Sequence, residues 1–161
     1  MQSKDPQAPT IVVVGSTNID LITYTQRAPE AGETLVADRF QMGFGGKGAN
    51  QAVMASLLGA QVSMVNNLGS DSYGEMTLEN FAQFGIDTSH VERVSGSSGV
   101  APIWVEADGT NRILIVPGAN ATMTPRQAVD ALAALPKPGV VVGQFEIPQA
   151  VTAAGFVAGR D

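Results

Sequence analysis

Apolar runs rich in β-branched residues recur along the chain, and segments with helical spacing separate them. The runs carry little polar alternation, which is typical of strands buried on both faces of a parallel sheet; they lie at 11–14, 62–69 and 140–143. Four helices are predicted from the apolar spacing between and after these runs, at 51–58, 71–85, 125–135 and from 148 onward. Strands that alternate with helices in this order predict an α/β domain with a right-handed parallel sheet.

Two of the predicted helices carry recognisable start signals. Ser72 with Glu75 three residues later has the spacing of a capping box. Thr124 is followed by Pro125 and then by Gln127, which combines a hydroxyl N-cap, proline at the first helical position and a box-closing amide. These signals predict helix starts at Ser72 and Thr124.

Two other segments are amphipathic rather than uniformly apolar. Residues 33–43 alternate apolar and polar side chains, and residues 99–117 hold two apolar runs around Asp108-Gly109, a strong hairpin signal. We predict that both segments form a small second sheet, a flap over the ligand edge of the first. The rest of the single domain is then its core, made of segments 10–32, 44–98 and 118–161.

A glycine-rich stretch joins the second sheet to the core. Residues 43–50 read Gly-Phe-Gly-Gly-Lys-Gly-Ala-Asn and run straight into a predicted helix. Glycines allow a ligand to approach the backbone closely, and the unpaired N–H groups of a helix N-terminus favour oxygen-rich or anionic ligands. A purely structural turn explains this stretch equally well when it is considered alone.

Polar side chains follow two of the predicted core strands at their carboxyl ends. Asn18 and Asp20 come after the first strand, and Glu146 comes after the third. Ligands of open α/β sheets bind at this edge, where Lys47 and Asn50 of the glycine stretch would join them. Carboxylates, amides and an ammonium group suit a small polyhydroxylated ligand, although Asn18 and Asp20 alone also fit an Asx-turn or a helix cap.

Composition limits the kinds of partner and site that the protein can have. The net charge of −6 opposes general binding to nucleic acid or to an anionic membrane. The absence of cysteine removes disulfides, thiolate metal sites and a cysteine nucleophile. Residues 1–9 are polar and proline-broken, unlike a signal peptide, and no apolar run approaches the length of a membrane span. A cytoplasmic protein is the expectation.

Other functional classes fit the sequence poorly. Gly43, Gly45 and Gly48 match the spacing of a dinucleotide fingerprint, but that fingerprint belongs after the first buried strand, which here ends without one. A P-loop fails because Gly48 follows Lys47 where Ser or Thr is required. His90 is the single histidine, predicted as a solvated residue in a polar link, so neither a histidine metal triad nor a hydrolase motif is present.

Several spaced motifs together resemble one family. They are Gly-Ser-Thr-Asn-Ile-Asp at 15–20, Pro-Glu-Ala-Gly-Glu-Thr at 29–34, Gly-Gly-Lys-Gly-Ala-Asn-Gln-Ala at 45–52, Pro-Gly-Ala-Asn at 117–120 and Gln-Phe-Glu at 144–146. In this order they resemble the N-terminal half of the ribokinase-type (pfkB) family of sugar and nucleoside kinases. The resemblance spans nearly the whole chain.

The resemblance implies a ribokinase-like parallel sheet flanked by helices, with a β-sheet lid through which the complete enzyme forms a homodimer. It implies transfer of the γ-phosphoryl group of ATP to a sugar hydroxyl, D-ribose to ribose 5-phosphate being favoured, with Mg²⁺ and a monovalent cation such as K⁺. By motif match it implies sugar-binding positions at Asn18, Ile19, Asp20, Gly46, Lys47, Gly48, Ala49, Asn50 and Glu146.

One family motif has no counterpart in the sequence. The Gly-Ala-Gly-Asp type segment, which supplies the catalytic aspartate and much of the nucleotide site, is not found, and family members are roughly twice as long. We therefore expect the fold to be incomplete at its C-terminus, the catalytic aspartate to lie beyond residue 161, and the chain alone to be inactive. Two alternatives stay open: a non-catalytic, truncated sugar-binding module, and a kinase of another sugar or a nucleoside.

Overall fold

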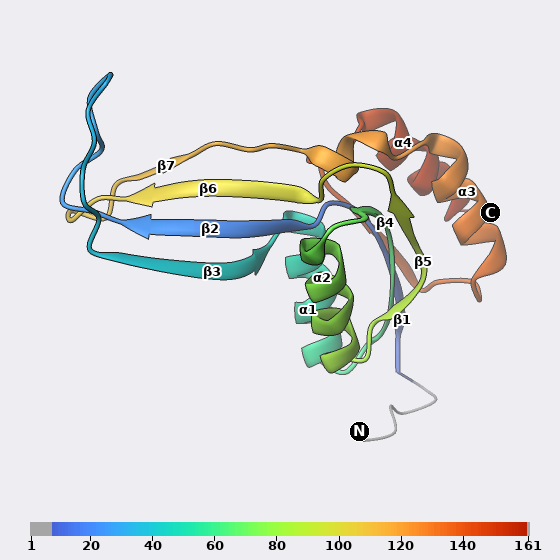
Figure 1. Cartoon of the computed structure of the whole chain (residues 1–161). Helices are drawn as coiled ribbons and strands as arrows, with labels where there is room; N and C mark the ends of the chain where they lie inside the picture. Colours follow the sequence, from blue (N-terminus) through green and yellow to red (C-terminus); the bar gives the residue numbers. More distant parts are fainter. Residues whose placement is uncertain (1–7, 161) are drawn as a thin grey trace.

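A four-stranded parallel sheet, sheet A, forms the centre of the molecule (Figure 1). The computed structural model describes residues 8–160, so the polar N-terminal segment 1–7 and Asp161 lie outside the described residues. The strand order is β5-β4-β1-β8, and each neighbouring pair is parallel. The strands are β1 (Thr10–Val14), β4 (Gln61–Gly69), β5 (Asp87–Val94) and β8 (Val140–Gly143). The three predicted core strands are confirmed, and β5 is an addition.

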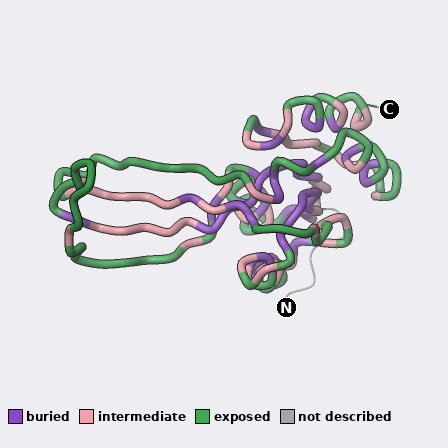
Figure 2. The backbone as a smooth tube through the Cα atoms, turned by 45° about the horizontal axis from the view of Figure 1, so that its top comes forward, coloured by how far each residue is buried: buried purple, intermediate pink, exposed green. Residues whose placement is uncertain are grey.

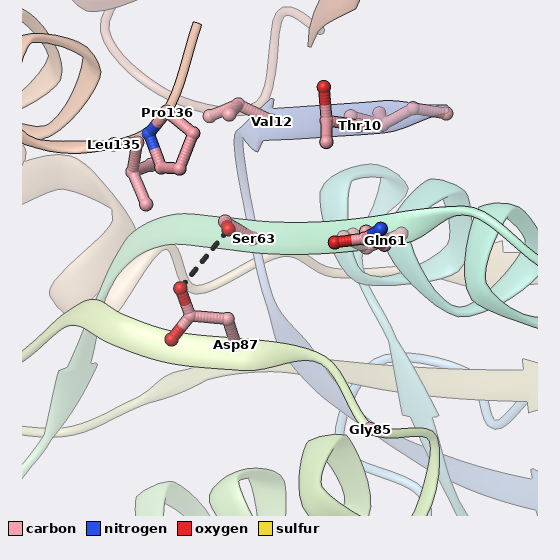
Figure 3. Close-up of a pocket in the computed structure, with 10 residues that line it drawn as sticks. Thr10, Val12, Gln61, Ser63, Gly85, Asp87, Leu135 and Pro136 are labelled. Carbon is pink, nitrogen blue, oxygen red and sulfur yellow. Dashed lines mark hydrogen bonds between the residues drawn. The ribbon is translucent and has the colours of Figure 1, made fainter. Parts of the chain in front are cut away.

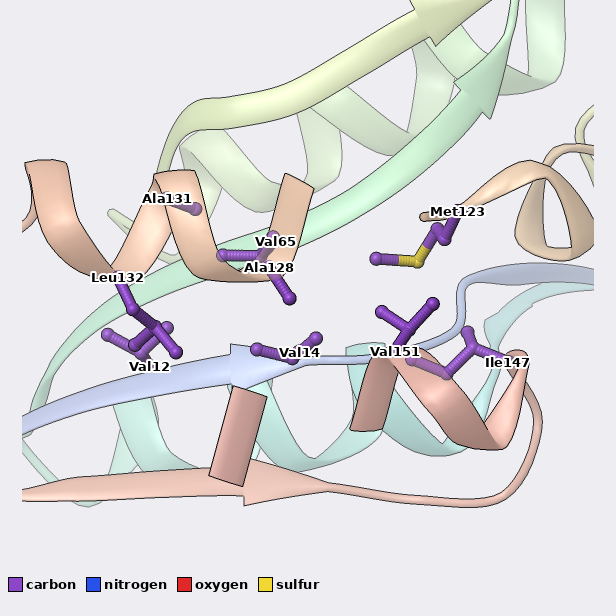
Figure 4. Close-up of a cluster of buried hydrophobic side chains, with 9 residues drawn as sticks. All are labelled: Val12, Val14, Val65, Met123, Ala128, Ala131, Leu132, Ile147 and Val151. Carbon is purple, nitrogen blue, oxygen red and sulfur yellow. The ribbon is translucent and has the colours of Figure 1, made fainter. Parts of the chain in front are cut away.

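Helices cover both faces of sheet A. The α1 (Lys47–Leu57) and α2 (Ser72–Gln83) helices lie on one face, and α3 (Pro125–Ala134) and α4 (Gln149–Ala158) lie on the other (Figure 1). Val12 and Val14 of β1 pack toward α3 and α4 (Figure 4), whereas Val13 packs toward α1 and α2. Successive side chains of a strand point to opposite faces, so this β-branched run is buried on both sides, as its composition predicts.

The helix starts match the sequence signals in part. Thr124 caps α3 with the complete predicted capping box. The predicted box of Ser72 and Glu75 is wrong: Asp71 is the N-cap of α2, and its carboxylate accepts a 2.9 Å hydrogen bond from the Gly74 N–H. The same carboxylate accepts from the Ser98 N–H and hydroxyl at 2.8 and 2.6 Å, so Asp71 is held from two sides.

The second sheet, sheet B, projects from the carboxyl end of sheet A (Figure 1). Its order is β3-β2-β6-β7, with β2 and β6 parallel and the outer pairs antiparallel. Its strands are β3 (Arg39–Gly45), β2 (Asn18–Tyr24), β6 (Gly99–Val105) and β7 (Asn111–Ile113). Figure 2 shows that buried residues are concentrated in sheet A and at the junction of the two sheets, whereas farther along sheet B the outer strands are exposed and the central strands intermediate.

Three boundaries differ from the prediction. Residues 33–38 are not a strand, because β3 begins at Arg39 and continues through the glycines to Gly45. The range 10–32, assigned to the core, contains β2, which pairs with strands of sheet B on both sides. The helix after the glycines begins at Lys47 rather than residue 51.

His90 lies within β5 rather than in a solvated link. Within residues 8–160 this strand lies at the edge of sheet A and pairs with β4 alone, and its sequence is polar. His90 is half-buried, and the prediction of a solvated residue is corrected accordingly.

Candidate functional site

The candidate site is built where the chain crosses from sheet A to sheet B, at Gly15-Ser16-Thr17 between β1 and β2. The N-terminus of α1 packs directly on this crossing. A Cβ atom added to Gly46 would lie 2.7 Å from the Thr17 Cα, and one added to Gly48 would lie 2.6 Å from the Ser16 backbone. Gly46 also has a φ of 88°, which disfavours any residue with a side chain. The glycine spacing is therefore required for the helix to approach the crossing.

The first N–H groups of α1 bind protein atoms. The Lys47 N–H donates to Glu146 Oε2 at 2.8 Å, the Gly48 N–H to the Ser16 hydroxyl at 3.3 Å, and the Ala49 N–H to the Ser16 carbonyl at 2.9 Å. We expected these groups to be unpaired and available to an oxygen-rich ligand. That expectation is wrong for these three N–H groups.

Glu146 ties the loop after β8 to the crossing and to α1. Its Oε2 accepts from the Ser16 hydroxyl at 2.7 Å and from the Lys47 N–H at 2.8 Å, and its Oε1 accepts from Lys47 Nζ at 2.9 Å. Burial opposes ionisation, but these hydrogen bonds together with the Lys47 charge outweigh it and lower the pKa of Glu146. The hydrogen bond to Glu146 and the negative charge of Glu146 raise the pKa of Lys47. Glu146 is therefore an ionised anchor.

Asp20 has a contrasting environment. It is half-buried on β2, and among residues 8–160 no group donates a hydrogen bond to its carboxylate. Burial raises the pKa of Asp20, and the nearby charge of Glu146 raises it further. A half-buried carboxylate without protein donors is well suited to accept hydrogen bonds from ligand hydroxyls.

Small residues leave space around this carboxylate. Asp20 pairs with Gly43 of β3 and Ala101 of β6, and Asn18 pairs with Gly45 and Gly99. Paired residues lie on one face of a sheet, so Asn18 and Asp20 share a face with a row of glycines and an alanine. A Cβ atom at Gly45 would lie 2.3 Å from Asp20 Oδ1, whereas one at Gly43 would meet open space. Gly43 therefore leaves open space beside Asp20, whereas the space above Gly45 is filled by the Asp20 carboxylate itself.

The structure brings four predicted residues to this junction, namely Asn18, Asp20, Lys47 and Glu146. Asn50 is exposed on α1, one turn after Lys47. Three other predicted positions are backbone or packing positions rather than exposed side chains: Gly46, Gly48 and Ala49. The side chain of Ile19 is buried and points to the opposite face of β2 from Asn18 and Asp20.

Three residues at the junction were not predicted as site residues. Ser16 bonds to Glu146 and receives the Gly48 N–H, and Gln144 accepts from the Ser16 N–H at 3.4 Å while donating to Gln51 at 2.8 Å. Asn120 contacts Thr17 and Asn18 from a short 3₁₀ helix, η1 (Gly118–Thr122). Each lies inside a motif that the sequence displays, but its partners are far along the chain.

A separate hollow of about 450 Å³ lies at the other end of sheet A. Figure 3 shows its lining, including Thr10, Gln61 and Asp87 at the starts of their strands, with the Ser63 hydroxyl donating to Asp87 at 3.1 Å. Ligands of parallel sheets bind at the carboxyl ends of the strands, so the junction is the better candidate.

The described part of the chain contains neither a candidate cluster of metal ligands nor a helix that could span a membrane. Among residues 8–160, no group of three or more histidine, aspartate and glutamate side chains is placed to hold a metal ion. No helix in that part of the chain is long and apolar enough to cross a bilayer.

Comparison with known proteins gives a consistent result. The family model described as pfkB family carbohydrate kinase matches residues 8–147. The chain is 46% identical over 138 residues to the deoxyribokinase of Salmonella typhimurium, covering 85% of this chain and 45% of that protein. It is 46% identical over 140 residues to the ribokinase of Bacillus subtilis, covering 86% and 47%.

A solved structure supports the same relationship at the level of the fold. The structure of Arabidopsis thaliana ribokinase complexed with ribose and ATP superposes with a TM-score of 0.78 at 33% identity, covering 95% of this chain and 52% of that one. The α/β architecture with parallel sheet A and mixed sheet B thus matches ribokinase structures, as the sequence motifs predicted. The chain spans about half the length of the curated relatives it matches. The protein belongs to the pfkB family of carbohydrate kinases.

Proposed function

We propose that this chain supplies the sugar-binding half of an ATP-dependent pentose kinase, which phosphorylates D-ribose to ribose 5-phosphate. The observation that carries the proposal is the Asp20 carboxylate, which has no hydrogen-bond donor among residues 8–160 and lies near Asn18, the glycines of β3 and the Lys47–Glu146 pair. Relatives named ribokinase and a ribokinase structure complexed with ribose and ATP support the choice of substrates.

Each group has a role in this proposal. Asp20 accepts hydrogen bonds from sugar hydroxyls, and Asn18 adds an amide on the same face of the strand. Lys47 and Asn50 bind from the first turns of α1, with Glu146 holding that turn in place. The backbone at Gly46, Gly48 and Ala49 shapes the wall, and Ile19 fixes β2 from its buried face.

Phosphoryl transfer itself requires groups outside this set. Catalysis of that step depends on positioning and on stabilising charge, and the sequence contains no Gly-Ala-Gly-Asp motif to supply the catalytic aspartate. We propose that the 161-residue chain alone binds sugar without transferring phosphate. Mg²⁺ and K⁺ belong to the proposed activity of the complete enzyme, but no residue described here is assigned to them.

We also propose that sheet B acts as a lid and pairs with a second copy. Phe40, Met42 and Phe44 alternate along β3 and are 63%, 41% and 42% exposed. Alternate residues share one face of a strand, so they form an apolar stripe that a second lid would cover. The proposed location is the cytoplasm, where ATP is available.

2-Deoxy-D-ribose is a specific alternative substrate, because this chain is as similar to the deoxyribokinase as to the ribokinase. Isothermal titration with D-ribose, 2-deoxy-D-ribose, D-fructose and adenosine separates the candidates. We expect D-ribose to bind most tightly and the Asp20→Ala variant to lose that binding. Tighter binding of 2-deoxy-D-ribose would transfer the proposal to deoxyribose, and no binding of any of the four would overturn it.

A further inference from the structure

Asn120 lies where the chain returns from the sheet B hairpin to sheet A, and the residue is 2% exposed. Its Oδ1 accepts a 2.9 Å hydrogen bond from the Thr17 N–H, and its Nδ2 donates to the Thr17 carbonyl at 2.9 Å. The same Nδ2 donates to Asn18 Oδ1 at 2.9 Å. The amide therefore holds both backbone groups of the residue that joins the two sheets.

The orientation of Asn120 follows from these contacts. A backbone N–H can only donate and a carbonyl can only accept, so a reversed Asn120 amide would place donor against donor and acceptor against acceptor at Thr17. Only one orientation satisfies both groups. Asn120 Nδ2 must then face Asn18, which requires Asn18 to turn its oxygen inward.

Asn18 is consequently left with one free polar atom. Its Oδ1 is used by Asn120, whereas its Nδ2 has no protein partner among residues 8–160, and the residue keeps 5% of its surface exposed. Gly99 leaves room for this contact, because a Cβ atom there would lie 2.3 Å from both Asn120 Nδ2 and Asn18 Oδ1. Space and hydrogen bonding both favour the same arrangement.

We propose that Asn120 is a positioning residue that sets the polarity of the sugar site, so that Asn18 acts as a hydrogen-bond donor. Asn18 then presents N–H groups and Asp20, two residues later on the same face, presents a carboxylate acceptor. A donor and an acceptor side by side match two hydroxyl groups of one sugar, one accepting and one donating. This inference rests on the proposed sugar-binding function.

A double-mutant cycle on sugar affinity tests this role, because it isolates the coupling between two residues. The dissociation constant of the preferred sugar is measured for the wild type, Asn18→Ala, Asn120→Ala and the double variant. We expect Asn120→Ala to weaken binding about tenfold, as loss of one well-placed hydrogen bond does. In the Asn18→Ala background the same change should weaken binding less than twofold.

Asn67→Ala is the matched control. Asn67 is also 2% exposed, and its side chain bonds to Thr122 at 2.8 Å and to Gln127 at 2.9 Å, away from Asn18. It should leave the dissociation constant within about twofold of wild type, although it removes two part-buried hydrogen bonds. Thermal unfolding monitored by circular dichroism shows whether each variant is folded at the assay temperature.

Asn120→Asp keeps the proposal testable if the alanine variant does not fold. It retains an acceptor for the Thr17 N–H but no donor for Asn18 Oδ1, so the Asn18 amide should turn and present its oxygen outward. The side-chain amide resonances of Asn18 in a ¹H–¹⁵N spectrum should shift without ligand, and sugar binding should weaken. Unchanged Asn18 resonances would overturn the inference.

The outcomes separate the inference from the function on which it rests. If the wild type binds none of the sugars, the proposed function fails and the inference fails with it. If the wild type binds but Asn120→Ala costs the same factor in both backgrounds, or Asn67→Ala costs as much, only the positioning role is overturned.

Discussion

Replacing Glu146 with glutamine tests the anchor at the centre of the junction. Glutamine keeps one oxygen, which can still accept from the Ser16 hydroxyl and from the Lys47 N–H. Both hydrogen bonds change from charge-assisted to neutral, which costs about 1 kcal/mol each. The exposed Lys47 ammonium group adds little to this loss because solvent screens it. The free energy of unfolding should therefore fall by about 2 kcal/mol, which lowers the Tm of a chain this long by about 4–8 °C.

The effect has a defined pH dependence. The pKa of Glu146 is lowered in the folded protein, so its stabilising contribution is complete above the pKa of the unfolded carboxyl group. It is lost as the pH falls through the lowered folded pKa, where Glu146 becomes neutral like glutamine. Circular-dichroism melting curves of wild type and Glu146→Gln should differ at pH 7 and converge in acid.

Glu106→Gln is the matched control for this prediction. Glu106 pairs with Arg112 at 2.8 Å, and its side chain is 16% exposed, close to the 18% of Glu146. Its carboxylate accepts from Arg112 alone among residues 8–160, so the loss should stay below about 1 kcal/mol, as for other surface ion pairs. Equal destabilisation by the two substitutions, or a Glu146→Gln gap that persists in acid, would refute the reasoning.

Four further substitutions test other contacts in the structure. Asp20→Asn should raise Tm at pH 7 while weakening sugar binding, because burial and Glu146 raise the pKa of Asp20 and so make its charged form unfavourable in the folded protein. In melting curves the gain in Tm should vanish as the pH falls from the raised pKa of folded Asp20 to the ordinary pKa of the unfolded carboxyl group. Gly48→Ala should destabilise by about 1–3 kcal/mol in urea unfolding, since its Cβ would lie 2.6 Å from the Ser16 backbone. Gly155 lies inside α4, and a Cβ atom there would make an ordinary 3.4 Å contact with Val14, so Gly155→Ala should instead stabilise the protein by about 0.5–1 kcal/mol. A Gly155→Ala variant less stable than Gly48→Ala would contradict this account. Met42→Glu should lower the dimer fraction in sedimentation velocity, and an unchanged fraction would exclude the lid stripe as the interface.

The sequence best predicts the elements whose signals come from residues close together in the chain. The uniform valine run of β1 and the Thr124 capping box each depend on residues close together in the chain, so both were predicted. Two strands were missed for different reasons. Strand β5 is a polar edge strand with one neighbour, and Asn18–Tyr24 was assigned to the core because one of its partner strands, β6, lies far along the sequence.

The same distinction applies to the site. Asp20 and Glu146 follow core strands, so the rule for parallel sheets located both from sequence alone. Ser16 and Asn120 act through contacts that span 130 and 103 residues, and neither the choice of partner nor the orientation of an amide follows from local pattern. The pairing of the first N–H groups of α1 could not be predicted for the same reason, because only folding brings Ser16 and Glu146 to them.

The most direct test of the central claim is a ¹H–¹⁵N titration of the chain with D-ribose, which shows where the sugar binds. We expect the largest shifts at the junction of the two sheets, at Asn18, Asp20 and Lys47, and their loss in Asp20→Ala. Residues such as Gln61 and Asp87, which line the hollow at the other end of sheet A, should stay unchanged. Shifts centred on that hollow, or no shifts at saturating sugar, would contradict the account.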